Sequence, residues 1–249
     1  MNRARGAFTL VELLVVVAIV AALVGMLLPA LSRAQDVARS VSCLSNLRQF
    51  NDAAAIYQAK WKGSFPVAYE TVVIDAVFVQ RSWDYNRRVD WSSGSASYEI
   101  TPGILWDKID APSKIQQCPV YRGESNSPGD PQTGYNYNTS YLGGGDGGVP
   151  ARITQVKDPA GTAAFGDGEY ASGANKYMRS PFSAPQEAIS GRHAGTQGYR
   201  HAGHANVGFV DGHAEPWSER HTTSYPATEP LIAEGTGFLS ADNSLYDLE

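Results

Sequence analysis

The chain has 249 residues, a formal net charge of −5 and a mean hydropathy of −0.28. This length allows one large domain, or a short segment followed by a domain of ordinary size. The acidic balance and the lack of a basic cluster argue against a nucleic-acid partner, and two cysteines are too few for a disulfide-rich scaffold.

The first predicted element is an apolar run from Phe8 to Leu31, which has about the 20 residues that a bilayer-spanning helix needs. Arg3 and Arg5 precede this run, and no acidic residue lies among the first eleven positions. By the positive-inside tendency, we expect a single span in the lipid bilayer, with the N-terminus in the cytoplasm and the rest of the chain exported.

Glu12 is the feature of this run that needs an explanation, because residues 13–31 carry no charged side chain. A carboxylate at the centre of a membrane helix costs roughly 2.5–3.5 kcal/mol, and such residues are functional by default. A secretory signal cleaved near residues 32–34, or a plain signal anchor, would leave Glu12 unexplained. Cleavage just before Phe8 would create an α-amino group that a neighbouring helix could place against this carboxylate.

The stretch Gly6-Ala7-Phe8-Thr9-Leu10-Val11-Glu12 resembles the type IV prepilin cleavage and methylation signal. In that family a prepilin peptidase cuts before Phe or Met and methylates the new amine, and the fifth mature residue is Glu. The resemblance implies cleavage between Ala7 and Phe8, N-methylation of Phe8 and a role for Glu12 in subunit assembly. The family usually has Gly before the cut, so cleavage after Gly6 is the alternative.

Pro29 falls where pilin-like proteins commonly bend, and an interior proline removes one helical hydrogen bond. We therefore expect a kink at Pro29, with the end of a helix as the alternative. Residues 32–62 then predict an amphipathic stalk helix, which stops at the breaker residues 63–66. Its apolar positions recur at three- and four-residue steps: Val37, Val41, Leu44, Leu47, Ala54, Tyr57 and Trp61.

Short strand-like segments among long loops predict an exported β-rich domain over residues 63–217, followed by an irregular tail at 218–249. Residues 70–80 are typical of one strand, and residues 205–217 of a hairpin with a two-residue Asp211-Gly212 turn. With a leader at 1–7, an assembly helix at 8–31 and the stalk at 32–62, the predicted fold class is α+β. We expect the long helix to pack on a small antiparallel sheet.

The hairpin region carries a second resemblance. His201, followed after nine residues by Asp211-Gly212, matches the H-x9-DG signature of a large pseudopilin-like family. The Cys118-Pro119 pair and residues 43–49 also look like that family, so the chain resembles a relative of the G-type pseudopilins of type II secretion. The resemblance implies like subunits in a helical filament, prepilin peptidase and the secretion or pilus assembly machinery as partners. It implies the bacterial inner membrane as the location, with the domain in the periplasm.

Cys43 and Cys118 are the only cysteines, and on the exported side of the membrane they could form a disulfide between the stalk helix and the domain. Two separate buried thiols are the alternative.

The last quarter of the chain holds all five histidines, with Asp167, Asp211 and Glu215 as further candidate zinc ligands. The alternative for His201 is a hydrogen bond to the hairpin backbone. Calcium could use oxygen ligands among Asp146, Asp167, Glu169 and Asp211. No spacing assigns a site, so we predict no resident metal and no cofactor.

No catalytic residue is predicted, because the chain has no Gly-x-Ser-x-Gly elbow, Walker loop or dinucleotide fingerprint. We therefore predict a structural filament subunit and not an enzyme. The alternative from a different class is a single-pass, membrane-anchored periplasmic binding or metal-binding module that does not polymerise.

Overall fold

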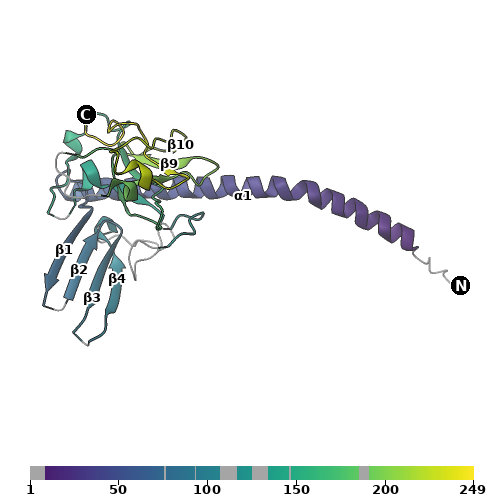
Figure 1. The fold of residues 1–249 in the computed structure, drawn as a ribbon, viewed down its shortest axis with the longest axis horizontal. Coiled ribbons are helices and arrows are strands. Elements are labelled where there is room, and N and C mark those ends of the chain that lie inside the picture. Colours follow the sequence, from purple (N-terminus) through teal and green to yellow (C-terminus); the bar gives the residue numbers. More distant parts are fainter. Residues whose placement is uncertain are drawn as a thin grey trace. The chain divides into compact units, whose positions relative to one another are not determined.

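The structure is a computed structural model, and it describes residues 9–75, 77–92, 94–106, 117–124, 134–145, 147–184 and 191–249. Its longest element is helix α1 (Leu10–Lys60), which contains Pro29 (Figure 1). The helix continues through Pro29, so the alternative that it ends there is wrong. Pro29 has no N–H to donate to the carbonyl of Gly25. The kink that this missing bond would allow stays a prediction.

The chain divides into two compact units, Met1–Arg39 and Ser40–Glu249. In the first unit, every Leu, Val, Ile and Met side chain from Leu10 to Leu31 is exposed, and even the least exposed of them, Val24, is 47% exposed. This part of α1 is long and apolar enough to cross a membrane. Leaving so much apolar surface in water costs about 25 cal/mol per Å², so the segment requires lipid or another protein around it.

The described residues of the second unit form three small sheets. The first is an antiparallel meander of four strands, β1 (Tyr69–Ile74), β2 (Val77–Ser82), β3 (Tyr85–Asp90) and β4 (Ser97–Pro102), which lie side by side in sequence order (Figure 1). The second has the order β10-β9-β6-β5-β7, and its neighbours are antiparallel except for the parallel pair β5 and β7. Its strands are β5 (Asn136–Asn138), β6 (Ala163–Gly166), β7 (Tyr177–Met178), β9 (Ala205–Phe209) and β10 (Ala214–Trp217).

The third sheet pairs β8 (Gln197–Gly198) with β11 (Thr236–Gly237). Short helical turns connect the strands: 3-10 turns at Ile104–Trp106, Ile153–Gln155, Arg192–Gly195 and Glu229–Leu231, and a π turn at Thr139–Gly143. A long N-terminal helix followed by small, mainly antiparallel sheets with loops confirms the predicted α+β fold class.

Two local predictions need correction. Residues 70–80 are not one strand, because the chain turns between Ile74 and Val77, which pair with each other. Asp75 has φ 54° there, and aspartate tolerates the left-handed conformation that a two-residue hairpin loop requires. The hairpin of β9 and β10 is present, but residues 210–212 form a three-residue loop closed by Gly212 at φ 99°.

The main core of the second unit forms around the C-terminal part of α1. Phe50 is fully buried, and its ring lies 5.0 Å from that of Tyr135, 5.5 Å from Phe165 and 5.7 Å from Trp83, measured between centroids. Strand β9 can approach α1 closely at Gly208, because this residue has no side chain. A Cβ on Gly208 would lie 2.9 Å from the side-chain amide nitrogen of Asn51 on α1.

A second, smaller core includes residues from the end of the chain. Phe238, Leu239 and Tyr246 are buried there beside Met178 and Phe209. The segment 218–249, which we expected to be an irregular tail, therefore contributes both β11 and core side chains to the domain.

Candidate functional site

The start of α1 is closed by reciprocal contacts between Thr9 and Glu12. The N–H and hydroxyl of Thr9 donate to Oε2 of Glu12 over 2.8 and 2.7 Å, and the N–H of Glu12 donates to the Thr9 hydroxyl over 3.2 Å. This arrangement is a capping box, in which an N-cap Thr and a Glu three residues later satisfy each other's backbone donors. We did not predict this role, although Thr-x-x-Glu before an apolar run is its sequence signature.

The capping box leaves part of the carboxylate available. Within the described residues, every hydrogen bond of Glu12 to Thr9 uses Oε2, and the residue is exposed. Glu12 can therefore cap its own helix and still present Oε1 to a cation on another chain. The predicted cleavage and methylation residues, Ala7 and Phe8, lie outside the described residues.

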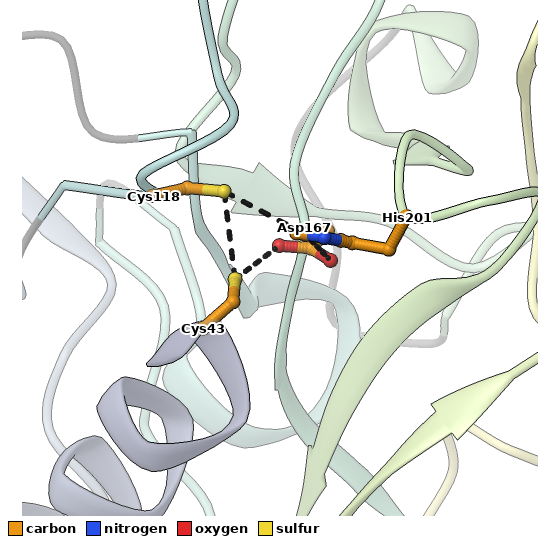
Figure 2. A group of neighbouring side chains, drawn as sticks. All are labelled: Cys43, Cys118, Asp167 and His201. Carbon is orange, nitrogen blue, oxygen red and sulfur yellow. Dashed lines mark hydrogen bonds and ion pairs between the residues drawn. The ribbon is translucent and has the colours of Figure 1, made fainter. Parts of the chain in front are cut away.

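A second group of functional side chains lies inside the domain, where four chain segments meet. Cys43 is on α1, Cys118 lies in the described segment 117–124, Asp167 follows β6 directly, and His201 lies in the turn before β9 (Figure 2). All four residues are buried. Their candidate ligand atoms all lie within 4.8 Å of one another.

The four side chains form a closed ring of contacts. Cys43 Sγ lies 3.4 Å from Cys118 Sγ and 3.1 Å from Asp167 Oδ1. His201 Nε2 lies 3.7 Å from Cys118 Sγ and 3.2 Å from Asp167 Oδ2. The two sulfur atoms are therefore neighbours, and both cysteines are free and buried; the disulfide between them stays a prediction. The side chain of His201 contacts this cluster, and not the hairpin backbone as the alternative had it.

Two glycines allow Asp167 to reach this position. A Cβ on Gly166 would lie 2.4 Å from Gln197 Oε1, and a Cβ on Gly168 would lie 2.5 Å from the carbonyl oxygen of Asn175. Both distances are shorter than van der Waals contact, so the Gly-Asp-Gly sequence lets the chain pass between β8 and the segment before β7.

The electrostatics of the cluster favour a mixture of charged and neutral groups. Burial raises the pKa of Cys43 well above its usual value, whereas the hydrogen bond from Cys43 lowers the pKa of Cys118 to about 4. Burial opposes the charge on Asp167, but Arg200 and His201 outweigh it and lower its pKa. For His201, burial is outweighed by the contacts with Asp167 and Cys118, which raise its pKa to about 9.

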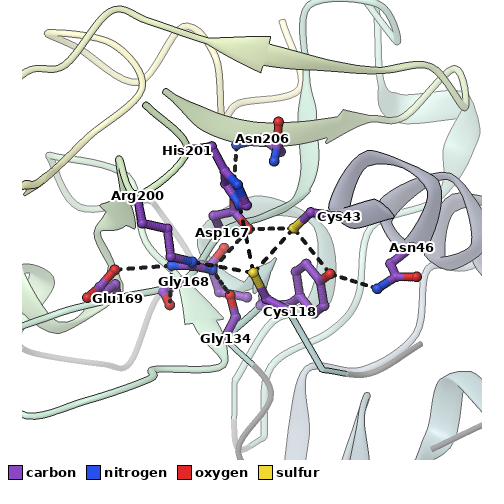
Figure 3. A network of polar contacts seen from close by, with 12 residues as sticks. Cys43, Asn46, Cys118, Gly134, Asp167, Gly168, Glu169, Arg200, His201 and Asn206 are labelled. Carbon is purple, nitrogen blue, oxygen red and sulfur yellow. Dashed lines mark hydrogen bonds and ion pairs between the residues drawn. The ribbon is translucent and has the colours of Figure 1, made fainter. Parts of the chain in front are cut away.

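Arg200 supplies a buried positive charge at the edge of the cluster. Its Nη2 donates to Asp167 Oδ1 over 2.9 Å, its Nε lies 3.5 Å from Cys118 Sγ, and its Nη1 pairs with Glu169 over 3.1 Å (Figure 3). The same side chain also donates to the carbonyl of Gly134. The Arg200 side chain is only 10% exposed, so these contacts fix its position.

A further layer of polar contacts surrounds Cys43. Its Sγ lies 3.2 Å from the hydroxyl of Tyr135, which in turn accepts a hydrogen bond of 3.0 Å from Asn46 on the next turn of α1 (Figure 3). Asn46 and Tyr135 are both buried, so this chain of contacts orients the hydroxyl beside the sulfur atom.

The two halves of the H-x9-DG motif lie in different surroundings. His201 belongs to the buried cluster, whereas Asp211 and Gly212 lie in the loop of the β9–β10 hairpin. There Asp211 Oδ1 accepts the N–H of His213 over 3.0 Å and contacts its ring Nδ1 at 2.5 Å. Among the predicted calcium ligands, Asp146 lies outside the described residues and Glu169 pairs with Arg200.

Comparison with protein families finds one match: residues 2–28 match the family described as the prokaryotic N-terminal methylation motif. No match to the chain was found among curated proteins or among solved structures. The chain thus has a prepilin-type N-terminal methylation motif that leads into a long apolar helix, which is consistent with a prepilin-like protein. The match supports a type IV pilin-like or pseudopilin protein processed by prepilin peptidase, and it covers neither the domain nor the H-x9-DG motif.

Proposed function

We propose that this chain is a structural subunit of a type II secretion pseudopilus or a type IV pilus-like filament, and not an enzyme. The observation that carries the proposal is the match of residues 2–28 to the methylation motif. Glu12 lies within the matched residues, and we assign it the role in assembly that the prepilin resemblance implies. In this proposal prepilin peptidase removes residues 1–7 between Ala7 and Phe8 and methylates Phe8.

The membrane arrangement in this proposal follows from charge and hydropathy. Arg3 and Arg5 remain in the cytoplasm, residues 8–31 cross the inner membrane once, and the domain lies in the periplasm. The exposed apolar side chains of α1 from Leu10 to Leu31 support contact with lipid before assembly and with neighbouring subunits after it.

Assembly in this proposal uses Oε1 of Glu12, the carboxylate oxygen that the capping box does not use. The methylated amine of Phe8 on a neighbouring subunit pairs with the Glu12 carboxylate while its own Thr9 cap stays in place. A carboxylate that costs roughly 2.5–3.5 kcal/mol at the membrane centre is then neutralised only in the correct register between subunits. Assembly machinery of the secretion or pilus type supplies further partners.

N-terminal sequencing and mass spectrometry of the membrane-extracted chain test the processing step. In cells that contain prepilin peptidase we expect the chain to begin at Phe8 with a methylated amine, and in cells without the peptidase we expect it to keep residues 1–7. Ala7→Gly, which restores the residue usual in the family, is the matched control and should give the same start. A start near Gln35 would indicate an ordinary secretory signal, and an uncut chain in the presence of the peptidase would indicate a simple anchor; either result contradicts the proposal.

A further inference from the structure

The cluster of Cys43, Cys118, Asp167 and His201 has the composition of a metal site. Two thiols, an imidazole and a carboxylate are the side chains that bind Zn²⁺ in proteins, and four protein ligands are the number found in its structural sites. Within the described part of the chain, this is the group of metal-type ligands whose atoms converge.

The spacing of these atoms fits a tetrahedral ion. With metal–ligand bonds of about 2.0–2.3 Å, neighbouring ligand atoms of a tetrahedral Zn²⁺ site lie roughly 3.3–3.8 Å apart. The four contacts of the ring measure 3.1, 3.2, 3.4 and 3.7 Å, with Cys43 and His201 facing different oxygens of Asp167. One ligand atom from each residue lies within 4.8 Å of every other. The 4.8 Å limit exceeds the tetrahedral range by about 1 Å, a difference that rotations of these side chains would have to close when the ion binds.

The charges around the cluster also match a bound dication. Two thiolates, one carboxylate and a neutral imidazole carry a charge of −3, so Zn²⁺ leaves −1 on the complex. The buried guanidinium of Arg200, in contact with both Asp167 and Cys118, supplies the compensating +1 within the buried group; Glu169, its other partner, is 35% exposed and keeps contact with solvent. A buried net charge of zero avoids the large cost of placing an unpaired charge in the protein interior.

Some of the surrounding contacts are of the kind found around metal ligands, whereas His201 Nδ1, the nitrogen that usually donates a hydrogen bond in such sites, has no partner in the described part of the chain. Groups of this kind orient the ligands and stabilise thiolates by donating hydrogen bonds to them. Arg200 Nε lies beside Cys118 Sγ, and the Tyr135 hydroxyl, held by Asn46, lies beside Cys43 Sγ. The backbone N–H of Asn206 holds Asp167 through Oδ2 over 2.7 Å.

We propose that Cys43, Cys118, Asp167 and His201 bind one Zn²⁺ ion in a closed, structural site inside the exported domain. Four bonds form, from the metal to two sulfur atoms, one nitrogen and one oxygen, and the ion loses its bound water. The proton of the Cys43 thiol and the proton on His201 Nε2 pass to solvent, so Zn²⁺ replaces two protons in the cluster. Because all four positions are filled by protein, the ion stabilises the fold and has no open position for a substrate.

A Cys43–Cys118 disulfide is the competing arrangement, because oxidised sulfurs cannot act as thiolate ligands. A disulfide would account for the two sulfur atoms, but it gives no reason for His201 and Asp167 to point at the same place (Figure 2). The metal site accounts for all four side chains, which is why we favour it.

The test uses the full-length chain, purified in detergent without chelators, and measures bound metal by mass spectrometry together with free thiols. We expect one Zn²⁺ per chain and two cysteines that react with a thiol reagent only after chelation. The chain should lose thermal stability on chelation and recover it when Zn²⁺ is added back. The reduced, metal-free chain should bind Co²⁺ with a thiolate-to-cobalt charge-transfer band and the intense visible bands of tetrahedral cobalt.

Two variants and one control locate the site. Cys118→Ser and His201→Ala should lose stoichiometric zinc. His204→Ala should keep it, because His204 pairs with His201 only through the backbone and its ring lies against the carbonyl of Ala202. The cobalt spectrum of the wild-type chain keeps the test valid if a variant fails to fold. A bridged Cys43–Cys118 pair in the isolated protein, or a reduced wild-type chain that gives no tetrahedral cobalt spectrum, would overturn the proposal.

Discussion

Replacing Glu12 with Gln should abolish filament assembly while leaving membrane insertion and removal of residues 1–7 unchanged. Gln keeps the size of the side chain and can still accept the N–H of Thr9, so the capping box survives. Only the negative charge is lost. In the proposed filament this change removes one partner of the pair between Glu12 and a neighbouring amine, and such a loss costs about 3–5 kcal/mol where the pair is buried. A loss of that size weakens each subunit contact by more than about a hundredfold.

Thr9→Ala is the control that separates the helix cap from the charge. It removes the hydroxyl of the capping box and leaves the Glu12 charge in place. We expect it to cost about 1 kcal/mol of helix stability and to permit assembly. The measurement is the amount of pelletable filament per processed subunit, with the N-terminus of each variant sequenced to show equal processing. If Glu12→Gln assembles like the wild type and Thr9→Ala does not, the acid serves the helix cap and the ion-pair model is wrong.

The sequence predicts the long helix well but only part of its buried face. Leu47 and Ala54 are buried as the three- and four-residue spacing indicated, whereas Val37 and Val41 are 64% and 60% exposed. Cys43 and Phe50, which the predicted stripe left out, are fully buried. Periodicity shows that a helix has an apolar face, but the exact side that is covered depends on which loops and strands pack against it.

The buried cluster could not be found from local spacing, because its members are distant in the sequence. Cys43, Cys118 and His201 were each recognised, and Asp167 was named among candidate ligands, yet no motif joins them. They meet because β6 pairs with β9 in the second sheet and because Cys43 and Cys118 both pack into the main core. Long-range pairing of this kind follows from the whole fold, whereas the Thr9–Glu12 capping box was visible in four consecutive residues.

Truncating Phe50 to Ala should cause the largest loss of stability in the domain among single changes on α1. Its ring contacts Tyr135, Phe165, Trp83 and Trp106, with centroids 5.0–5.7 Å apart. Loss of a buried Phe side chain costs about 3–5 kcal/mol, part of it from the cavity that remains. At about 2–4 °C per kcal/mol for a domain of this size, the melting temperature should fall by roughly 6–20 °C.

Tryptophan fluorescence during thermal unfolding measures this change directly, because Trp83 and Trp106 lie against Phe50. Ile56→Ala is the matched control, since Ile56 is on the same helix but 57% exposed, and it should shift stability by no more than about 0.5 kcal/mol. Equal shifts in the two variants would mean that the domain does not depend on α1 for its core. A large shift for Phe50 alone would make the helix an integral part of the domain, so that its C-terminal part could not separate from the sheets while the domain stayed folded.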